Sequence, residues 1–97
     1  MQVFDTVSGA RVAELPLCGD ADDLFLDAER RRLYAVCGDG RVAIIGQRDG
    51  DRYDTVQNIA TSPGARTGLW VQATKTLFVA APASQGSPAA VLVYRLE

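Results

Sequence analysis

The sequence predicts an all-β fold built from antiparallel meanders. The stretch from Leu24 to Ile45 contains three short apolar runs, and each run is closed by turn residues. The first two of these runs recur roughly 45 positions later, which is the spacing of a structural repeat. No segment has the length and periodicity of an amphipathic helix. Together these three observations indicate a chain of repeated β-units.

The first unit is expected to contribute two strands, at residues 2–5 and 11–15. The turn between them contains Gly9, which supplies a positive φ where the chain reverses. The second of these strands alternates polar and apolar residues, as a strand with one wet face does. Pro16 then ends it, so this strand belongs at the edge of a sheet.

The second unit is expected to contain four strands, at residues 24–27, 32–37, 41–45 and 53–60. A loop at 18–23 precedes it. Gly38-Asp39-Gly40 lies between two apolar runs and is a strong hairpin signal. The last strand of this unit is the least apolar of the four, which fits an outer position.

The third unit repeats the beginning of the second. Its strands are expected at residues 69–72, 76–80 and 89–95, after a loop at 61–67. Residues 81–88 are small and rich in proline and serine, and they form the connection before the last strand.

The repeat is clearest when segments of the second and third units are superimposed. Leu24–Ala28 is set over Leu69–Ala73, and Leu33–Val36 over Leu77–Ala80, with one residue deleted in the intervening turn. A third register relates residues 3–5, 43–46 and 92–94. A period in the forties with several short strands per unit is typical of a propeller blade.

The sequence therefore predicts a partial β-propeller of roughly two blades in one domain. With strands a to d counted outward from the hub, residues 1–18 supply strands c–d of one blade. Residues 19–62 supply a complete four-stranded blade, and residues 63–97 supply strands a–c of another. The inner strands are apolar on consecutive residues, so we expect them to be buried on both faces. Incomplete blades at both ends would leave open edges, which predicts self-association or packing on the rest of a propeller.

Composition excludes several classes of function. The chain has 97 residues and a formal charge of −2, so it offers no broad basic surface for nucleic acid. No apolar run approaches the length of a membrane helix, and the first residues lack the charged and apolar pattern of a secretory signal, so we expect none in this chain. Histidine is absent, which removes the commonest general base and any Ser-His or Cys-His nucleophile. A non-catalytic protein without a cofactor is expected.

The two cysteines, Cys18 and Cys37, allow two interpretations. They are too few to bind zinc without other soft ligands. The favoured interpretation is two separate small residues buried at strand ends. The alternative is one disulfide formed in an oxidising compartment.

The candidate binding site lies in the loops that lead into the inner strands. Asp20, Asp22 and Asp23 form a carboxylate cluster, and Arg66 lies in the equivalent loop of the next unit. Oxygen ligands of this kind can hold Ca²⁺ or Mg²⁺, although the spacing is not that of an EF-hand. Arg66 could bind an anionic ligand or pair with these carboxylates. Solvated charges are the simpler explanation for all four residues.

Other conspicuous side chains have simpler explanations. Arg30, Arg31 and Arg32 form a charged turn that we expect to be solvated. Tyr34 and Trp70 fall on inner strands, where packing in the core is the expected role.

These features resemble the YVTN (YncE-like) β-propeller repeat. The segments that carry the resemblance are Val3–Gly9, Asp27–Tyr34 and Leu92–Tyr94: a Phe-Asp-Thr hairpin, an apolar strand ending in Asp with a charged turn, and a closing apolar strand. The resemblance implies a longer propeller of which this chain is a carboxy-terminal part, and it allows a periplasmic or secreted location for that parent. It carries no single activity.

The sequence thus predicts a non-catalytic propeller segment that serves as a binding or scaffold module. The partner would be a protein or a small molecule bound at the rim loops. The alternative is a fragment of a metal-dependent propeller hydrolase such as a lactonase, in which Asp20, Asp22 or Asp23 would be ligands and the remaining ligands would lie outside this chain.

Overall fold

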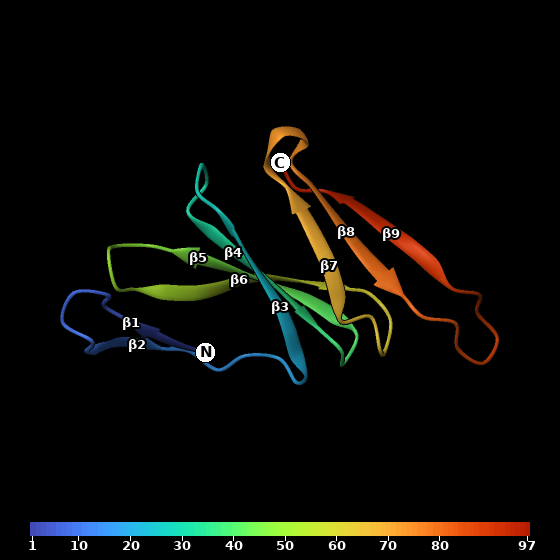
Figure 1. Cartoon of the computed structure of the whole chain (residues 1–97), viewed down its shortest axis with the longest axis horizontal. Coiled ribbons are helices and arrows are strands. Elements are labelled where there is room, and N and C mark those ends of the chain that lie inside the picture. The colour runs from blue at the N-terminus through green and yellow to red at the C-terminus, as the bar shows by residue number, and fades with distance from the viewer.

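Consecutive strands pair antiparallel throughout the chain, in a computed structural model that describes all 97 residues (Figure 1). The first sheet, sheet A, pairs β1 (Gln2–Phe4) with β2 (Arg11–Glu14). The carboxylate of Asp5 caps the turn between them, because its Oδ1 accepts the backbone N–H groups of Val7 and Ser8, each at 2.8 Å. This turn chemistry fixes a short hairpin at the amino-terminal end.

Sheet B is the four-stranded meander that the sequence predicts for the second unit. Its strands follow chain order: β3 (Ala21–Asp27), β4 (Arg32–Cys37), β5 (Arg41–Gln47) and β6 (Tyr53–Ala60). The bounds of β4 and β6 agree with the sequence prediction. β3 begins earlier than expected, because Ala21 pairs with Cys37 and Asp23 pairs with Val36 across a bulge. Asp22 and Asp23 therefore belong to a strand and not to a loop.

Sheet C contains β7 (Thr67–Val71), β8 (Thr76–Ala81) and β9 (Ala90–Arg95). A single 3-10 turn, η1 (Gln72–Thr74), joins β7 to β8 and is the one helical element. The all-β prediction is thus confirmed. The structure contains no helix with the length and hydropathy that a membrane-spanning segment needs.

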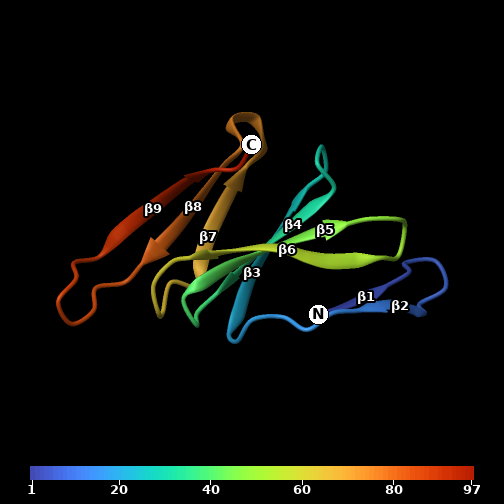
Figure 2. The same ribbon diagram turned by 180° about the vertical axis from the view of Figure 1, so that it is seen from behind.

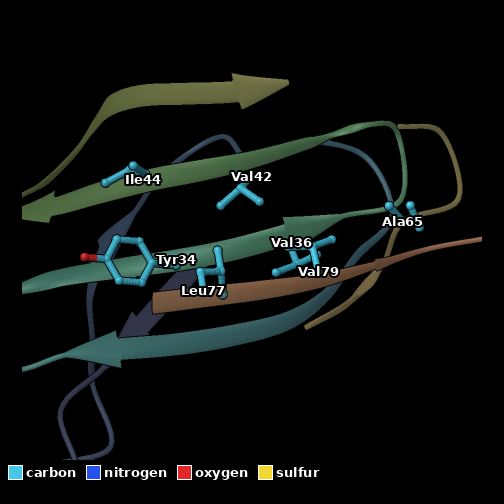
Figure 3. Close-up of a cluster of buried hydrophobic side chains, with 8 residues drawn as sticks. Tyr34, Val36, Val42, Ile44, Ala65, Leu77 and Val79 are labelled. Atoms are coloured by element: carbon cyan, nitrogen blue, oxygen red, sulfur yellow. The ribbon is translucent and has the colours of Figure 1, made fainter. Parts of the chain in front are cut away.

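Sheet B lies between the other two sheets (Figures 1 and 2). One face of β4 and β5 packs on sheet C through a core of eight buried residues: Tyr34, Val36, Val42, Ile44, Ala65, Leu77, Val79 and Ala81 (Figure 3). The opposite face packs toward sheet A through Ala35, Cys37, Ala43 and Ile45, with Met1, Leu15 and Leu17 against them. The expectation that inner strands are buried on both faces is therefore confirmed for β4 and β5.

The same expectation is wrong for β3. Leu24 and Leu26 are 54% and 62% exposed, although Phe25 between them packs on the core shared with sheet C. The reason is that sheet A packs on only part of this face of sheet B and leaves β3 uncovered. An apolar groove between β1 and β3 is the result.

The strand pairing of sheet B recurs in sheet C, but its register in the first strand differs from the sequence alignment. Leu24 pairs with Ala35 and Leu26 with Leu33 in sheet B, whereas Gly68 pairs with Val79 and Trp70 with Leu77 in sheet C. When the pairs of β3 and β4 are matched to the pairs of β7 and β8, both strands show the same offset of 44 residues, and no residue is deleted in the turn. Leu24 thus corresponds to Gly68, and Leu26 to Trp70.

Backbone conformation supports this offset independently. Arg31 and Lys75 are 44 residues apart and have φ angles of 56° and 53°. Asp20 and Gly64 are also 44 residues apart, with φ angles of 58° and 86°. Left-handed conformations are uncommon outside glycine, so their recurrence at one spacing marks equivalent turns in two copies of one unit.

Candidate functional site

The candidate rim residues Asp20 and Arg66 meet in the structure. Arg66 donates from Nε and Nη2 to the Oδ2 atom of Asp20, at 2.9 and 2.8 Å. Each side chain is about half exposed, at 50% and 52%. Of the two roles that the sequence left open for Arg66, the structure shows pairing with a carboxylate. This ion pair joins the loop before β3 to the loop before β7, so it links two consecutive units.

Asp23 makes a second link between the same two sheets. Its Oδ2 atom accepts the backbone N–H of Gly68 at 2.8 Å. A glycine is needed at this point, because a Cβ on residue 68 would lie 3.0 Å from the carbonyl oxygen of Phe78 and 3.1 Å from Val36 Cγ2. Gly68 therefore lets β7 lie close to β8 and to sheet B, and Asp23 accepts its backbone N–H.

Asp22 differs from its two neighbours. Its side chain is exposed and makes no hydrogen bond or ion pair within the chain. The three carboxylates do not converge: no group of three or more His, Cys, Asp or Glu side chains has the arrangement of a metal site. Asp20 and Arg66 thus connect the two loops, and Asp23 connects the two sheets. Of the four candidate rim residues, only Asp22 presents an unpaired charge to solvent.

A second polar cluster lies at the other end of β3, and the sequence did not identify it as a site. Asp27 is fully buried. The Tyr34 hydroxyl donates to its Oδ2 atom at 2.7 Å, and the Gln72 amide donates to its Oδ1 atom at 3.0 Å. Trp70 in turn donates from Nε1 to Gln72 Oε1 at 3.0 Å. We call these four residues the Asp27 cluster.

The Asp27 cluster connects sheet B to sheet C. Asp27 and Tyr34 come from β3 and β4, whereas Trp70 and Gln72 come from β7 and the turn that follows it. The rings of Tyr34 and Trp70 also pack against each other in a tilted arrangement, with centroids 4.7 Å apart and planes inclined by 58°. The expected core role of both aromatic residues is confirmed, and each also places a polar group where it finds a partner.

The surroundings of Asp27 shift two pKa values in opposite directions. Burial alone would raise the pKa of Asp27, but hydrogen bonds from Tyr34, Gln72 and the Arg30 backbone, with the charge of Arg30, outweigh it and lower the pKa below 3.8. Burial, together with the hydrogen bond and negative charge of Asp27, raises the pKa of Tyr34 to about 12. Asp27 is therefore an anion and Tyr34 a neutral donor at neutral pH.

Arg30 corrects one expectation from the sequence. The charged turn 29–32 was predicted to be solvated, yet the Arg30 side chain is only 20% exposed and its Nη1 atom lies 3.8 Å from Asp27 Oδ2. That nitrogen is buried without a hydrogen-bond partner. Arg31 remains exposed and Arg32 is half-buried. The turn thus bends one cation back over the Asp27 carboxylate.

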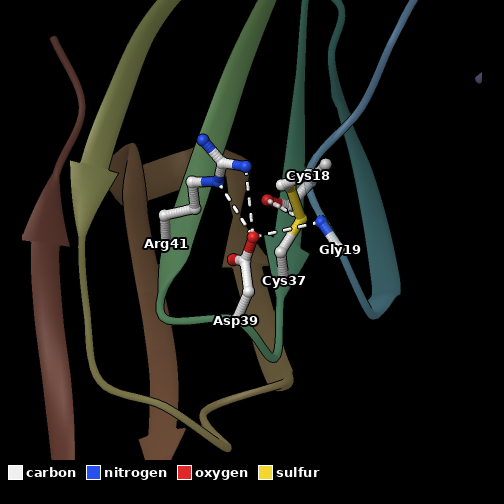
Figure 4. Close-up of a disulfide and its surroundings, with 6 residues drawn as sticks. Cys18, Gly19, Cys37, Asp39 and Arg41 are labelled. Carbon is white, nitrogen blue, oxygen red and sulfur yellow. Dashed lines mark hydrogen bonds and ion pairs between the residues drawn. A yellow bond between two sulfur atoms is a disulfide. The ribbon is translucent and has the colours of Figure 1, made fainter.

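Cys18 and Cys37 form a disulfide, with their Cα atoms 6.1 Å apart (Figure 4). The favoured interpretation from the sequence, two unpaired buried cysteines, is therefore wrong. The segment after β2 lies beside the end of β4, which brings the two cysteines together. The Oδ2 atom of Asp39 also helps to hold this segment in place. It accepts the Gly19 backbone N–H at 3.0 Å and pairs with Arg41 at 3.1 Å. The disulfide holds sheet A against sheet B.

The signal for the Asp27 cluster was present in the sequence in part. An aspartate at the end of an apolar strand is unusual in a buried position, and the resemblance quoted above already included it. Gln72 and Trp70 gave no comparable signal, because their role depends on how sheet C packs on sheet B. No protein-family model, curated protein or solved structure matches the chain.

Proposed function

We propose that the chain is a non-catalytic segment of a β-propeller, similar to the YVTN repeat, that acts as a binding or scaffold module through its rim loops. The observation that carries this proposal is the stacking of repeated meanders: sheet B lies between two neighbours that bury both faces of β4 and β5, and sheet C repeats its pairing at an offset of 44 residues. Stacked sheets with inner strands at one axis are the arrangement of propeller blades.

The polar links between the sheets support a scaffold role. They occur at both ends of the inner strand β3, through Asp23 at one end and Asp27 at the other. Such links fix the angle between two blades and leave the loops on the rim in defined positions. Loops held on a rigid framework are the common location of binding residues.

The ligand would bind beside Asp22 and the Asp20–Arg66 pair. Asp22 offers a free carboxylate, and Arg66 offers an exposed guanidinium group that already donates hydrogen bonds to Asp20. A protein or small molecule with a cationic group could pair with Asp22, and an anionic group could compete with Asp20 for Arg66. The site therefore favours ligands that carry both charges or several hydrogen-bond donors and acceptors.

The proposal is tested by two-dimensional ¹H–¹⁵N NMR of the full chain during titration with a library of charged and zwitterionic small molecules. A ligand at the rim shifts the amide signals of Asp22, Gly38 and Arg66, and Asp22→Ala or Arg66→Ala removes those shifts. Asp51→Ala serves as a control, because Asp51 is an exposed aspartate in the turn before β6. Shifts that survive both rim substitutions would show that the rim residues do not bind.

The hydrolase alternative is less well supported by the geometry. Asp20 and Asp23 already have partners, so a metal ion would have to compete with Arg66 and with the Gly68 N–H. Calorimetric titration with Ca²⁺ and Mg²⁺ separates the two ideas. Stoichiometric binding that Asp22→Ala abolishes would favour the hydrolase fragment.

A further inference from the structure

An apolar groove separates β1 from β3, on the face of sheet B that the β1–β2 hairpin covers only in part. Its volume is about 450 Å³. The apolar side chains that line it include Val3 and Phe4 on one side and Leu24 and Leu26 on the other. Phe4, Leu24 and Leu26 are each more than half exposed. The groove is continuous with the packed interface that Met1, Leu15 and Leu17 form against sheet B.

We propose that this groove is a binding site for a two-stranded β-hairpin of the same repeat, with an apolar outward face and an acidic residue in its turn. The inference rests on the repeat architecture proposed above. Sheet B shows what a complete unit contains: its first hairpin, β3–β4, pairs with the strand β5 that follows. β1 occupies the third-strand position of the first unit and is paired only with β2. A hairpin in the groove would pair with the free edge of β1 and complete four strands.

The apolar character of the hairpin follows from the residues it would meet. Where sheet C packs on β3, it presents Gly68, Trp70 and Gln72; Gly68 donates its backbone N–H to Asp23, and Gln72 donates its side-chain amide to Asp27. The equivalent positions, 44 residues earlier, are Leu24 and Leu26, which line the groove, and Ala28, which has no side-chain amide to donate. A carboxylate in the bound hairpin at the position equivalent to Asp27 would lack that donor, whereas an apolar face would bury Leu24 and Leu26.

The acidic turn follows from an ion pair that already joins two consecutive units. Glu29 in the turn of β3–β4 lies 3.9 Å from Lys75, which follows the turn of the next unit. Arg31 is the equivalent of Lys75, has the same left-handed backbone conformation and lines the groove. No acidic side chain of the chain pairs with Arg31, and none lines the groove. A carboxylate at the position equivalent to Glu29 in the bound hairpin would pair with Arg31.

The chain itself supplies a suitable probe. Residues 67–81 form the hairpin β7–β8, whose outward face carries the exposed Leu69 and the partly exposed Phe78. Ala73 is the position equivalent to Glu29 in this segment, so a synthetic peptide with Ala73→Glu adds the acidic residue. Both peptides, labelled with fluorescein, are titrated with the 97-residue chain, and affinity is measured by fluorescence anisotropy.

We expect the Ala73→Glu peptide to bind about two- to fivefold more tightly than the natural sequence, the gain of one exposed ion pair. Arg31→Glu in the protein should remove this difference or reverse it. Leu26→Glu should weaken both peptides about tenfold or more, because a charge then occupies the floor of the groove. Amide hydrogen exchange in β1 should slow when the hairpin binds, as it does for a strand that gains a partner.

The matched control is Val93→Glu, which places the same charge on the exposed outer face of sheet C, where Val93 is 61% exposed. It should leave both affinities unchanged. The proposal would be overturned if neither peptide binds, or if Val93→Glu abolishes binding while Leu26→Glu does not. Either result leaves the rim titration unaffected, so the two proposals fail separately. Circular dichroism checks that each variant is folded. We expect Leu26→Glu to fold, because the Leu26 side chain is mostly exposed.

Discussion

The hydroxyl of Tyr34 donates a 2.7 Å hydrogen bond to the buried carboxylate of Asp27. This bond lies in the interface between sheets B and C, at the end of β3, where Gln72 of the third unit donates to the other oxygen of the same carboxylate. A buried carboxylate is tolerated only when its charge is well solvated by donors. The Asp27 cluster therefore couples the stability of sheet B to its packing against sheet C.

Removing one member of the Asp27 cluster should lower the free energy of unfolding. We expect Tyr34→Phe to cost about 1–2 kcal/mol and Asp27→Ala about 2–4 kcal/mol, since the latter leaves Tyr34, Gln72 and Arg30 without their shared acceptor. Urea denaturation monitored by circular dichroism measures both. A double-mutant cycle with Gln72→Ala should show coupling with Asp27→Ala, and purely additive costs would contradict a shared cluster.

Stability should fall in acid through Asp27. The pKa of this carboxyl is lowered in the folded state, so its contribution is fully present above the unfolded value of 3.8 and is lost as the pH falls through the folded value. Denaturation curves at a series of pH values between 7 and 2 measure this loss. Asp27→Asn should be less stable at neutral pH and show a shallower acid dependence, whereas an unchanged profile would mean that other carboxylates cause it.

Stability should also fall in alkali, through Tyr34. Its pKa is about 12 in the folded state against 10.0 for the free side chain. The neutral phenol is thus favoured by folding, and its contribution is present below pH 10 and is lost as the pH rises toward 12, by about 2–3 kcal/mol. Phenolate absorbance should show a titration near pH 12 from Tyr34, and Tyr94 should also titrate late because burial raises its pKa. Tyr34→Phe should remove the titration near pH 12, and Tyr94→Phe provides the control because it leaves that titration in place.

The disulfide should stabilise the chain by restricting its unfolded state. Cys18 and Cys37 are 19 residues apart in the sequence. Closure of a loop of this size contributes about 3 kcal/mol in the chain-entropy treatment. We expect Cys18→Ser with Cys37→Ser to lose roughly that amount and to increase hydrogen exchange in β1 and β2. Equal exchange in the two proteins would mean that the apolar contacts alone hold sheet A.

Local patterns predict most of the strands, because turn residues and apolar runs are local signals. Two features are not local and were missed. The similarity of Leu-Phe-Leu to Leu-Trp-Val favoured an alignment that is shifted by one residue, since nothing in the sequence shows that Gly68 must replace Leu24 where two sheets approach closely. The links made by Asp23 and Asp27 likewise depend on the packing of sheet C, so the sequence could suggest the cluster of Asp20, Asp22 and Asp23 but neither the partner of Asp23 nor the buried role of Asp27.

Two glycines offer a matched test of this packing. A Cβ on residue 68 would press against the backbone carbonyl of Phe78 and the Val36 side chain, neither of which can move without disturbing the core. A Cβ on residue 38 would instead meet the Asp20 carboxylate and Arg66 Nε, which are half exposed and free to rotate away. We expect Gly68→Ala to destabilise the chain by about 1–3 kcal/mol and Gly38→Ala by less than about 1 kcal/mol. Urea denaturation of the two variants measures the difference. A larger cost at residue 38 would show that the Asp20–Arg66 pair, and not the approach of β7 to β3, holds the two sheets together.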